Sequence, residues 1–163
     1  VEIAGQAGFV IQDVLMKQLQ EIMTRVENPR RAKDIMTTGI VWGEPDSTVG
    51  SLLDVMKEKH VSRIPIRKQG KLIGVFSENA VFRRLVQGKP LKRQETMVDW
   101  LEDLRLDHPD SERYEFCQEN DPVHILESRF CKPARQRLAI LFVKNSRQTI
   151  TGMVTVYDIA RSD

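Results

Sequence analysis

The sequence predicts an α/β (α+β) fold built from two similar half-domains, because one succession of elements occurs twice along the chain. The first copy spans about residues 41–85 and the second about residues 115–160. Each copy has a short apolar stretch, a polar turn that opens a helix, a β-rich run, a second strand that ends in Gly, and a closing helix behind a hydroxyl residue. Two such half-domains would bury their apolar faces on each other, and we expect a ligand in the crevice between them.

The elements of the two copies correspond one by one. The turns that open the first helix lie at residues 45–49 and 119–123. The β-rich runs and the strands that follow them are also matched, at 63–66 and 71–74 in the first copy and at 140–143 and 149–152 in the second. Ser77 and Thr155 then stand before the closing helices, in the position that a capping hydroxyl takes.

The residues before the first copy predict an amphipathic helix. Apolar side chains recur at spacings of three and four between Phe9 and Val26, and Asn28-Pro29 stops the pattern. We expect this helix to dock on the repeats as part of the core. Pairing with a second chain and connection to a missing output domain are the alternatives. The start at Val1 rather than Met is consistent with a chain cut from a larger protein.

The composition is that of a soluble globular protein and argues against several classes of function. Of the 163 residues, 40% are hydrophobic and 29% charged, and the net charge of +2 argues against a nucleic-acid or membrane-surface protein. The longest apolar run, 138–143, is too short to cross a bilayer, and the two cysteines form no CxxC pair, so we expect a reducing, cytoplasmic setting. The histidines lack metal-ligand spacing, and Walker, GxGxxG and GxSxG motifs are missing, so we expect neither a metal site nor an enzyme.

The repeated segments resemble a tandem pair of cystathionine-β-synthase (CBS) domains, a Bateman module. In the first copy the resemblance rests on residues 33–37, 46–49, 62–66 and 70–75, and in the second mainly on 150–159. It implies a β-α-β-β-α unit in each repeat, a pseudo-twofold pair of clefts, and frequent assembly of two chains. It also implies an adenine nucleotide or adenosyl ligand and regulation of an attached enzyme or channel. We therefore divide the chain into an N-terminal helix (1–31), a first repeat (32–88), a linker (89–96) and a second repeat (97–163).

The run from Gly152 to Asp158 carries the strongest candidate for a ligand site. A helix that starts at Thr155 would point unpaired amides, with partial positive charge, at a phosphate. Asp158, three residues on, would accept hydrogen bonds from both hydroxyls of a ribose. The resemblance assigns these phosphate and ribose roles to the hydroxyl and the acid, and Gly152, followed by Met153, would let ligand and backbone approach closely. The alternative is a capping box, in which Asp158 satisfies the helix's own amides.

The first repeat departs from this pattern, because Ala80 stands where the ribose acid belongs. Ser77 is therefore expected to be a plain N-cap, and we expect one good nucleotide site per chain, built around the second repeat. Arg63 stands where related modules often carry a basic residue that reaches the phosphate held by the other repeat, with a solvated Arg as the alternative. Arg137 and Arg135 are weaker candidates for the same contact.

Aromatic and apolar residues suggest two further contacts. Tyr114 and Phe116 lie on the strand that opens the second repeat, where an aromatic ring could stack on adenine; a core role is the alternative. The first long helix carries apolar residues that could face a second chain and so predict a homodimer, namely Leu52, Leu53, Val55 and Met56.

We conclude from the sequence that the chain is a non-catalytic regulatory module. It requires no cofactor and takes AMP, ADP, ATP, cyclic di-AMP or a related adenosyl compound as a regulatory ligand. The rival hypotheses are a ligand-free dimerisation scaffold, in which Thr155 and Asp158 only cap a helix, and a regulatory fragment of a larger enzyme or transporter. A rise in melting temperature with an adenine nucleotide would separate the first hypothesis from these two.

Overall fold

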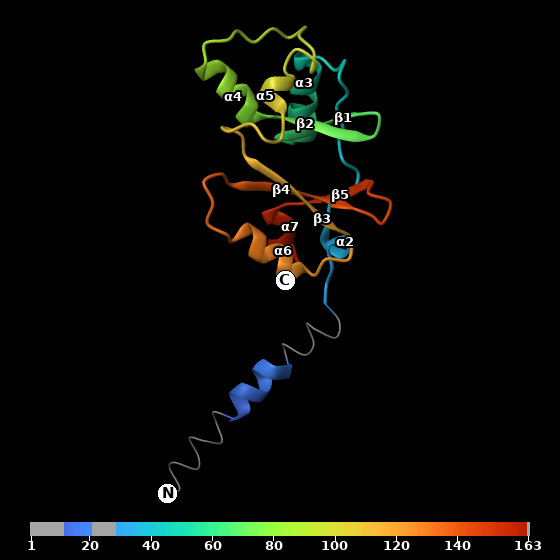
Figure 1. The fold of residues 1–163 in the computed structure, drawn as a ribbon, viewed down its shortest axis with the longest axis vertical. Helices are drawn as coiled ribbons and strands as arrows, with labels where there is room; N and C mark the ends of the chain where they lie inside the picture. Colours follow the sequence, from blue (N-terminus) through green and yellow to red (C-terminus); the bar gives the residue numbers. More distant parts are fainter. Residues whose placement is uncertain (1–11, 21–28, 163) are drawn as a thin grey trace, which may run out of the picture.

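The protein has two halves, each built on a small β-sheet with helices packed against it (Figure 1). The computed structural model describes residues 12–20 and 29–162. In the first half, β1 (Arg63–Lys68) pairs antiparallel with β2 (Lys71–Ser77), and α3 (Val49–Lys59) and α4 (Glu78–Val86) flank the hairpin. Gly43 adds a single parallel bridge to Ile66, so the expected opening strand of this repeat is reduced to one bridge.

The second half contains the expected β-α-β-β-α unit in full. Its sheet has the order β3-β4-β5, with β3 (Arg113–Gln118) parallel to β4 (Leu138–Lys144) and β4 antiparallel to β5 (Ile150–Val154). Helix α6 (Val123–Phe130) connects β3 to β4, and α7 (Val156–Arg161) follows β5. The mixed α/β fold with two related halves is confirmed.

Local signals in the sequence explain where these elements begin and end. The Thr48 hydroxyl accepts a hydrogen bond from the Ser51 amide at the start of α3, and the Ser77 hydroxyl accepts one from the Ala80 amide at the start of α4. The hairpin between β1 and β2 turns through Gln69 and Gly70, both with positive φ, as a tight two-residue turn requires.

The short helix that precedes each half in the sequence packs on the other half. Helix α2 (Ala32–Ile35), which precedes the first sheet, packs on the second: the Ala32 amide donates to the Asp121 carbonyl, and Ala32 lies in a core cluster with Cys117 and Leu126. In the opposite direction, α5 (Leu101–Leu104) packs on the first half, where Trp100 and Leu104 join the core. The first residues of the predicted second repeat therefore contribute to the core of the first half.

A third apolar cluster joins the two halves. It contains Val75 from β2, Tyr114 from β3, and Ile140 and Phe142 from β4, with Met153 of β5 packed against it. The expectation that the half-domains bury apolar faces on each other is confirmed.

The N-terminal helix differs from its prediction. Residues 12–20 are helical, but every one of them is exposed, and in Figure 1 they lie apart from both halves. Val14, Leu15, Met16 and Leu19 are each about half exposed, so docking of this segment as part of the core is wrong for the described residues. The rest of the predicted apolar face lies outside the described residues. No helix in the described part of the chain has the length and apolar character needed to cross a membrane.

Candidate ligand cleft

Thr155 and Asp158 form the capping box at the start of α7. Asp158 is buried, with 5% of its surface exposed. Its Oδ2 accepts hydrogen bonds from the Thr155 amide at 2.8 Å and from the Thr155 hydroxyl at 3.2 Å. Its Oδ1 accepts one from the Thr37 hydroxyl and one from Arg161 Nη2, each at 2.9 Å. Because a carboxylate offers about four acceptor positions, the protein fills all those of Asp158.

Gly152 and Met153 hold the segment that brings Thr37 to Asp158. The Thr37 amide donates to the Met153 carbonyl at 2.8 Å, and the Met153 amide donates back to the Thr37 carbonyl at 3.0 Å. A Cβ at position 152 would lie 2.5 Å from Sδ of Met36. The close approach expected at Gly152 is therefore present, and in this structure the neighbour is Met36.

A polar hollow of about 310 Å³ lies beside Asp158, between α2 and the end of α7. It is lined mainly by charged residues, together with Ile35 and Ser162. The charged residues are Arg30, Asp34, Asp158 and Arg161. Arg161 is largely exposed, so its contact with Asp158 faces solvent.

Arg63 lies at the start of β1 and is held by an acid of the second half. Its Nε and Nη2 donate to the two carboxylate oxygens of Glu112, at 2.8 Å and 2.7 Å. The Tyr114 hydroxyl lies 3.4 Å from Oε2 of Glu112. The pKa of Glu112 is held below its usual range, first by the hydrogen bonds from Arg63 and, to a smaller extent, by the charge of Arg137. Arg137 itself is exposed.

Tyr114 and Phe116 lie on the same face of β3, against the ring of Phe142. Ring centroids are 6.3 Å apart for Tyr114 and 5.9 Å apart for Phe116. Tyr114 is buried in the cluster that joins the halves, and burial raises the pKa of Tyr114 to about 12. Phe116 is 36% exposed, and the Lys144 ammonium lies 4.2 Å from its ring centroid. The core alternative thus describes Tyr114, whereas Phe116 keeps a partly open ring.

Comparison with known proteins agrees with this architecture. Residues 32–87 match the model of the CBS domain family, and no curated protein sequence matches the chain. The CBS domain of a bacterial CNNM/CorC family Mg²⁺ transporter in complex with ATP superposes with a TM-score of 0.60 at 19% identity, over 88% of this chain and 92% of that one. The CBS domain pair of protein MJ0100, in complex with 5′-methylthioadenosine and S-adenosyl-L-methionine, gives 0.61 at 18% identity, over 82% and 95%. The CBS domain protein TA0289 of Thermoplasma acidophilum, of unknown function, gives 0.62 at 17% identity, over 82% and 68%.

The chain folds as a tandem pair of CBS domains. At these identities the likeness establishes the fold. The predicted fold class is confirmed, and the match to the CBS domain family covers residues 32–87.

The CBS pair divides the candidate residues between two places. Thr155, Asp158, Gly152 and Met153 meet the Thr37 segment at the second repeat. Arg63 and Tyr114 meet at Glu112, with Arg137 near enough to influence that acid. The described contacts therefore place Arg63 with Glu112 and Thr155 with Asp158, in two separate groups of polar residues.

Three residues of these groups had no role in the sequence prediction: Thr37, Glu112 and Arg161. Thr37 belongs to the leading run 33–37 that marked the CBS resemblance, and Glu112 ends the polar loop before β3. Nothing in the local sequence of Thr37 or Glu112 indicates its partner, because Asp158 and Arg63 lie 121 and 49 residues away from them.

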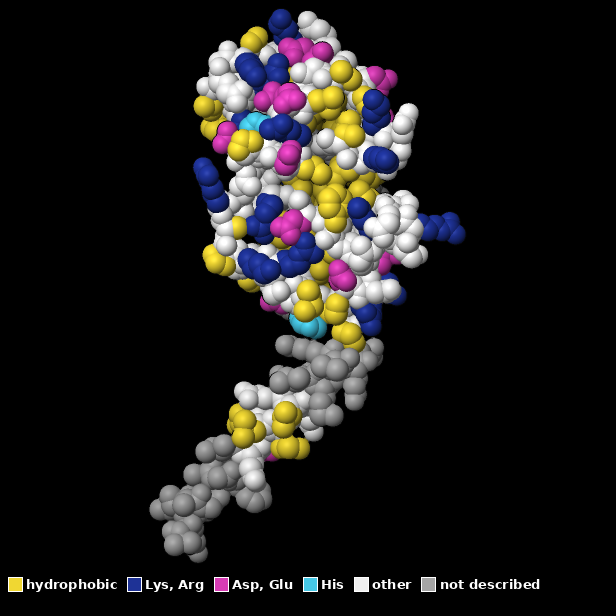
Figure 2. Space-filling model, in the orientation of Figure 1, with side chains coloured by type: hydrophobic (Ala, Val, Ile, Leu, Met, Phe, Trp, Pro, Cys, Tyr) yellow, Lys and Arg dark blue, Asp and Glu magenta, His cyan; other side chains and the backbone are white. Residues whose placement is uncertain are grey.

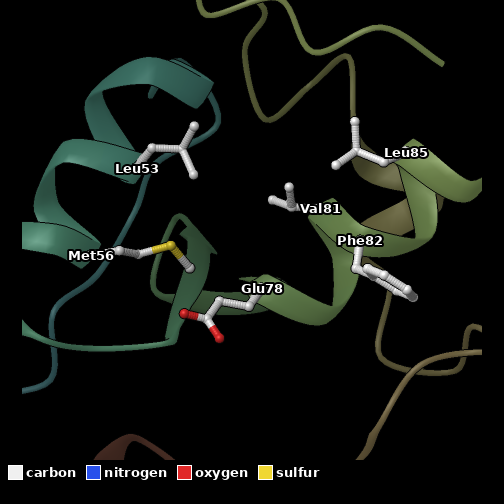
Figure 3. A pocket seen from close by; sticks show the side chains of 6 residues that line it. All are labelled: Leu53, Met56, Glu78, Val81, Phe82 and Leu85. Atoms are coloured by element: carbon white, nitrogen blue, oxygen red, sulfur yellow. The ribbon is translucent and has the colours of Figure 1, made fainter.

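The CBS pair also has an apolar groove between α3 and α4. Figure 3 shows Leu53 and Met56 of α3 facing Val81 and Leu85 of α4 across it, and the groove has a volume of about 250 Å³. Phe82 of α4 is 66% exposed beside it. Of the residues predicted to face a second chain, Leu52 and Met56 are buried and Leu53 and Val55 are partly buried. The most exposed apolar surface here belongs to α4, which the sequence prediction did not include.

Proposed function

We propose that this CBS pair is a regulatory module that binds an adenine nucleotide or a related adenosyl ligand in the cleft between its repeats. The observation that carries the proposal is the position of the buried Asp158, which joins the start of α7 to the leading segment of the first repeat through Thr37. Solved CBS pairs described as complexes with ATP, 5′-methylthioadenosine and S-adenosyl-L-methionine have the same fold and support this class of ligand.

The two oxygens of Asp158 have different partners, which suggests how a ribose would bind. Oδ2 is bound to Thr155 of its own helix, whereas Oδ1 is bound to Thr37 and Arg161, which are both exposed. Ribose hydroxyls would replace these two donors at Oδ1 and leave the cap intact. Met153 and the open face of Phe116 would then offer apolar surface to the base.

Exchange of the Thr37 hydrogen bond couples the ligand to the arrangement of the repeats. A ligand shifts a conformational equilibrium only by its preference for one state. A ribose on Asp158 favours the state in which Thr37 has been released, so the segment that connects α2 to the first half changes its contacts. The regulated output would lie in a partner or in a further part of the protein.

A thermal-shift panel tests the proposal directly. It contains adenosine, AMP, ADP, ATP, cyclic di-AMP, 5′-methylthioadenosine and S-adenosylmethionine. A ligand at a hundredfold excess over its dissociation constant adds about 2.7 kcal/mol. For a protein of this size the melting temperature should rise by roughly 5–10 °C, at about 2–4 °C per kcal/mol. A flat response to the whole panel by ligand-free protein would reject the proposal.

The apolar groove between α3 and α4 favours a second candidate function, a homodimeric scaffold. Phe82, Leu85 and Val86 are all more than half exposed on α4, and such surface is costly to leave in water. The two candidates are compatible, because the groove and Asp158 lie in different halves. If no ligand of the panel raises the melting temperature and the protein is a stable dimer, only the scaffold function would remain.

A further inference from the structure

The Arg63–Glu112 pair has the geometry of an occupied anion site. The guanidinium presents Nε and Nη2 as a planar fork, and both carboxylate oxygens of Glu112 accept from it, at 2.8 Å and 2.7 Å. Two phosphate oxygens would engage the same fork in the same way. The side chains are 26% and 18% exposed, so the pair is neither fully buried nor free in solvent.

Glu112 is held in this position from several sides. The pair brings together β1 of the first half and the loop before β3 of the second half. Within that loop Ser111 is buried, and Nδ1 of His108 is within hydrogen-bond distance of Arg83 of α4 and accepts from the Asp110 amide. Gln136, before β4, donates to the Pro109 carbonyl. A loop with this many contacts presents Glu112 to Arg63 in a preset position.

Glu112 occupies the position beside Arg63, and its negative charge would also repel a phosphate that enters there. Its lowered pKa means that Glu112 carries a full negative charge at neutral pH. A phosphate entering beside Arg63 would have to displace this charge or accept a like charge as its neighbour. An uncharged ribose or adenosyl group meets neither obstacle.

We propose that Glu112 is a built-in anion that fills the phosphate position of Arg63, so that the cleft selects adenosyl ligands without a phosphate at this position over their phosphorylated counterparts. This inference rests on the proposed function for its choice of ligand. It assigns Glu112 as a specificity-determining residue and changes the expected role of Arg63, which binds an internal carboxylate in the parent protein.

Calorimetric titration of adenosine, AMP and inorganic phosphate into the parent and two variants tests the inference. The parent should bind adenosine more tightly than AMP. Glu112→Gln keeps the side-chain shape and removes the charge, and should strengthen AMP binding about tenfold to a hundredfold, the value of one or two charge-assisted hydrogen bonds. Adenosine affinity should change by less than about twofold. Glu44→Gln is the matched control, because Glu44 pairs with Arg67 of the same strand on exposed surface and should change neither affinity.

The double variant Arg63→Ala/Glu112→Gln tests whether the guanidinium of Arg63 causes the gain in AMP affinity. In this variant the gain should disappear. Should Glu112→Gln fail to fold, as judged by its melting curve, Glu112→Ala also removes the carboxylate and carries the same comparison. An unchanged ratio of AMP to adenosine affinity in the folded variant overturns the inference and leaves the proposed function standing. If no protein binds adenosine or AMP, but Glu112→Gln gains phosphate binding that needs Arg63, Glu112 still fills an anion position at Arg63, whereas the selection among adenosyl ligands falls together with the proposed function.

Discussion

At the scale of single residues, Asp158 forms the cap that the sequence set against ribose binding, and the proposed function would add the ribose role to it. The capping box uses Oδ2, and the contacts that a ribose would replace use Oδ1. Capping and ribose binding therefore draw on different oxygens of one carboxylate. The presence of the cap does not weigh against a ligand site, because the cap orients the acid whose other oxygen faces exchangeable donors.

Substitution of Asp158 and of Thr37 separates the two oxygens. Asp158→Ala removes the cap, which should cost about 1 kcal/mol of unfolding free energy, and should weaken an adenosyl ligand on the order of tenfold to several hundredfold. Thr37→Val removes only a donor to Oδ1, so stability should fall less and ligand affinity should hold or rise. Denaturant unfolding and calorimetry measure both quantities. An Asp158→Ala variant that binds like the parent would show that the site is misassigned.

The Arg63–Glu112 pair predicts a dependence of stability on pH. The pKa of Glu112 is lower in the folded protein than in the unfolded chain, mainly through its hydrogen bonds with Arg63. The pair's contribution to stability is therefore complete above the unfolded pKa of a Glu, about 4.3, and is lost as the pH falls through the lowered pKa of Glu112.

Melting curves of the parent and Glu112→Gln from neutral to acidic pH measure this contribution. The parent should melt higher at neutral pH, and the difference should shrink as the pH falls below about 4. Glu44→Gln, which breaks an exposed pair with Arg67, should track the parent at every pH. A difference between parent and Glu112→Gln that stays constant with pH would contradict the assignment.

At the scale of elements, two glycines allow each leading segment to reach the opposite half. A Cβ on Gly152 of β5 would meet the Met36 side chain, and a Cβ on Gly74 of β2 would lie 2.6 Å from the Leu104 carbonyl oxygen. The two strands occupy equivalent places in the repeats, and in both of them a side chain at the glycine would collide with the segment packed on the strand. The difference lies in what blocks the space, a flexible thioether at one glycine and backbone at the other.

Because of this difference, we expect an alanine at Gly74 to lower the unfolding free energy more than an alanine at Gly152. Gly74→Ala forces α5 away from β2 and should lower the unfolding free energy by about 1–3 kcal/mol or more. Gly152→Ala meets atoms that can rotate away, and should cost less than about 1 kcal/mol. Denaturant titration of both variants measures the two costs side by side. The reverse order would mean that the packing of α5 on β2 is looser than the structure indicates.

The sequence predicts the elements of this protein well and their partners poorly. Caps at Ser77 and Thr155, the repeated strands and the order of helices rest on local signals within a few residues. The crossed docking of α2 and α5 rests on contacts between distant segments, for which one sequence has no signal. The same holds for the candidate site residues: Arg63 and Asp158 are recognisable from their motifs, whereas Glu112 and Thr37 become visible only when the two halves are brought together.

At the scale of the whole molecule, apolar helix surface is exposed in both halves. The first half has Phe82, Leu85 and Val86 on α4, and the second has the exposed Ile125 of α6 and Tyr157 of α7. On the face drawn in Figure 2, hydrophobic side chains also gather where the halves meet, among interspersed charges. The matched exposure on helices of both repeats favours a partner with the same two-part surface, and a second copy of this chain has one.

Dimerisation through α3 and α4 is therefore the last prediction. Light scattering at micromolar concentration should give about twice the mass of one chain. Phe82→Glu places a charge beside the apolar groove of Figure 3, where desolvation without a partner costs several kcal/mol, so the dissociation constant should rise at least about a hundredfold. Val98→Glu is the control, because Val98 is also more than half exposed but does not line the groove. A parent protein that remains monomeric with and without an adenosyl ligand contradicts the prediction. If the protein is a dimer that Phe82→Glu leaves unchanged, the interface does not include this part of α4.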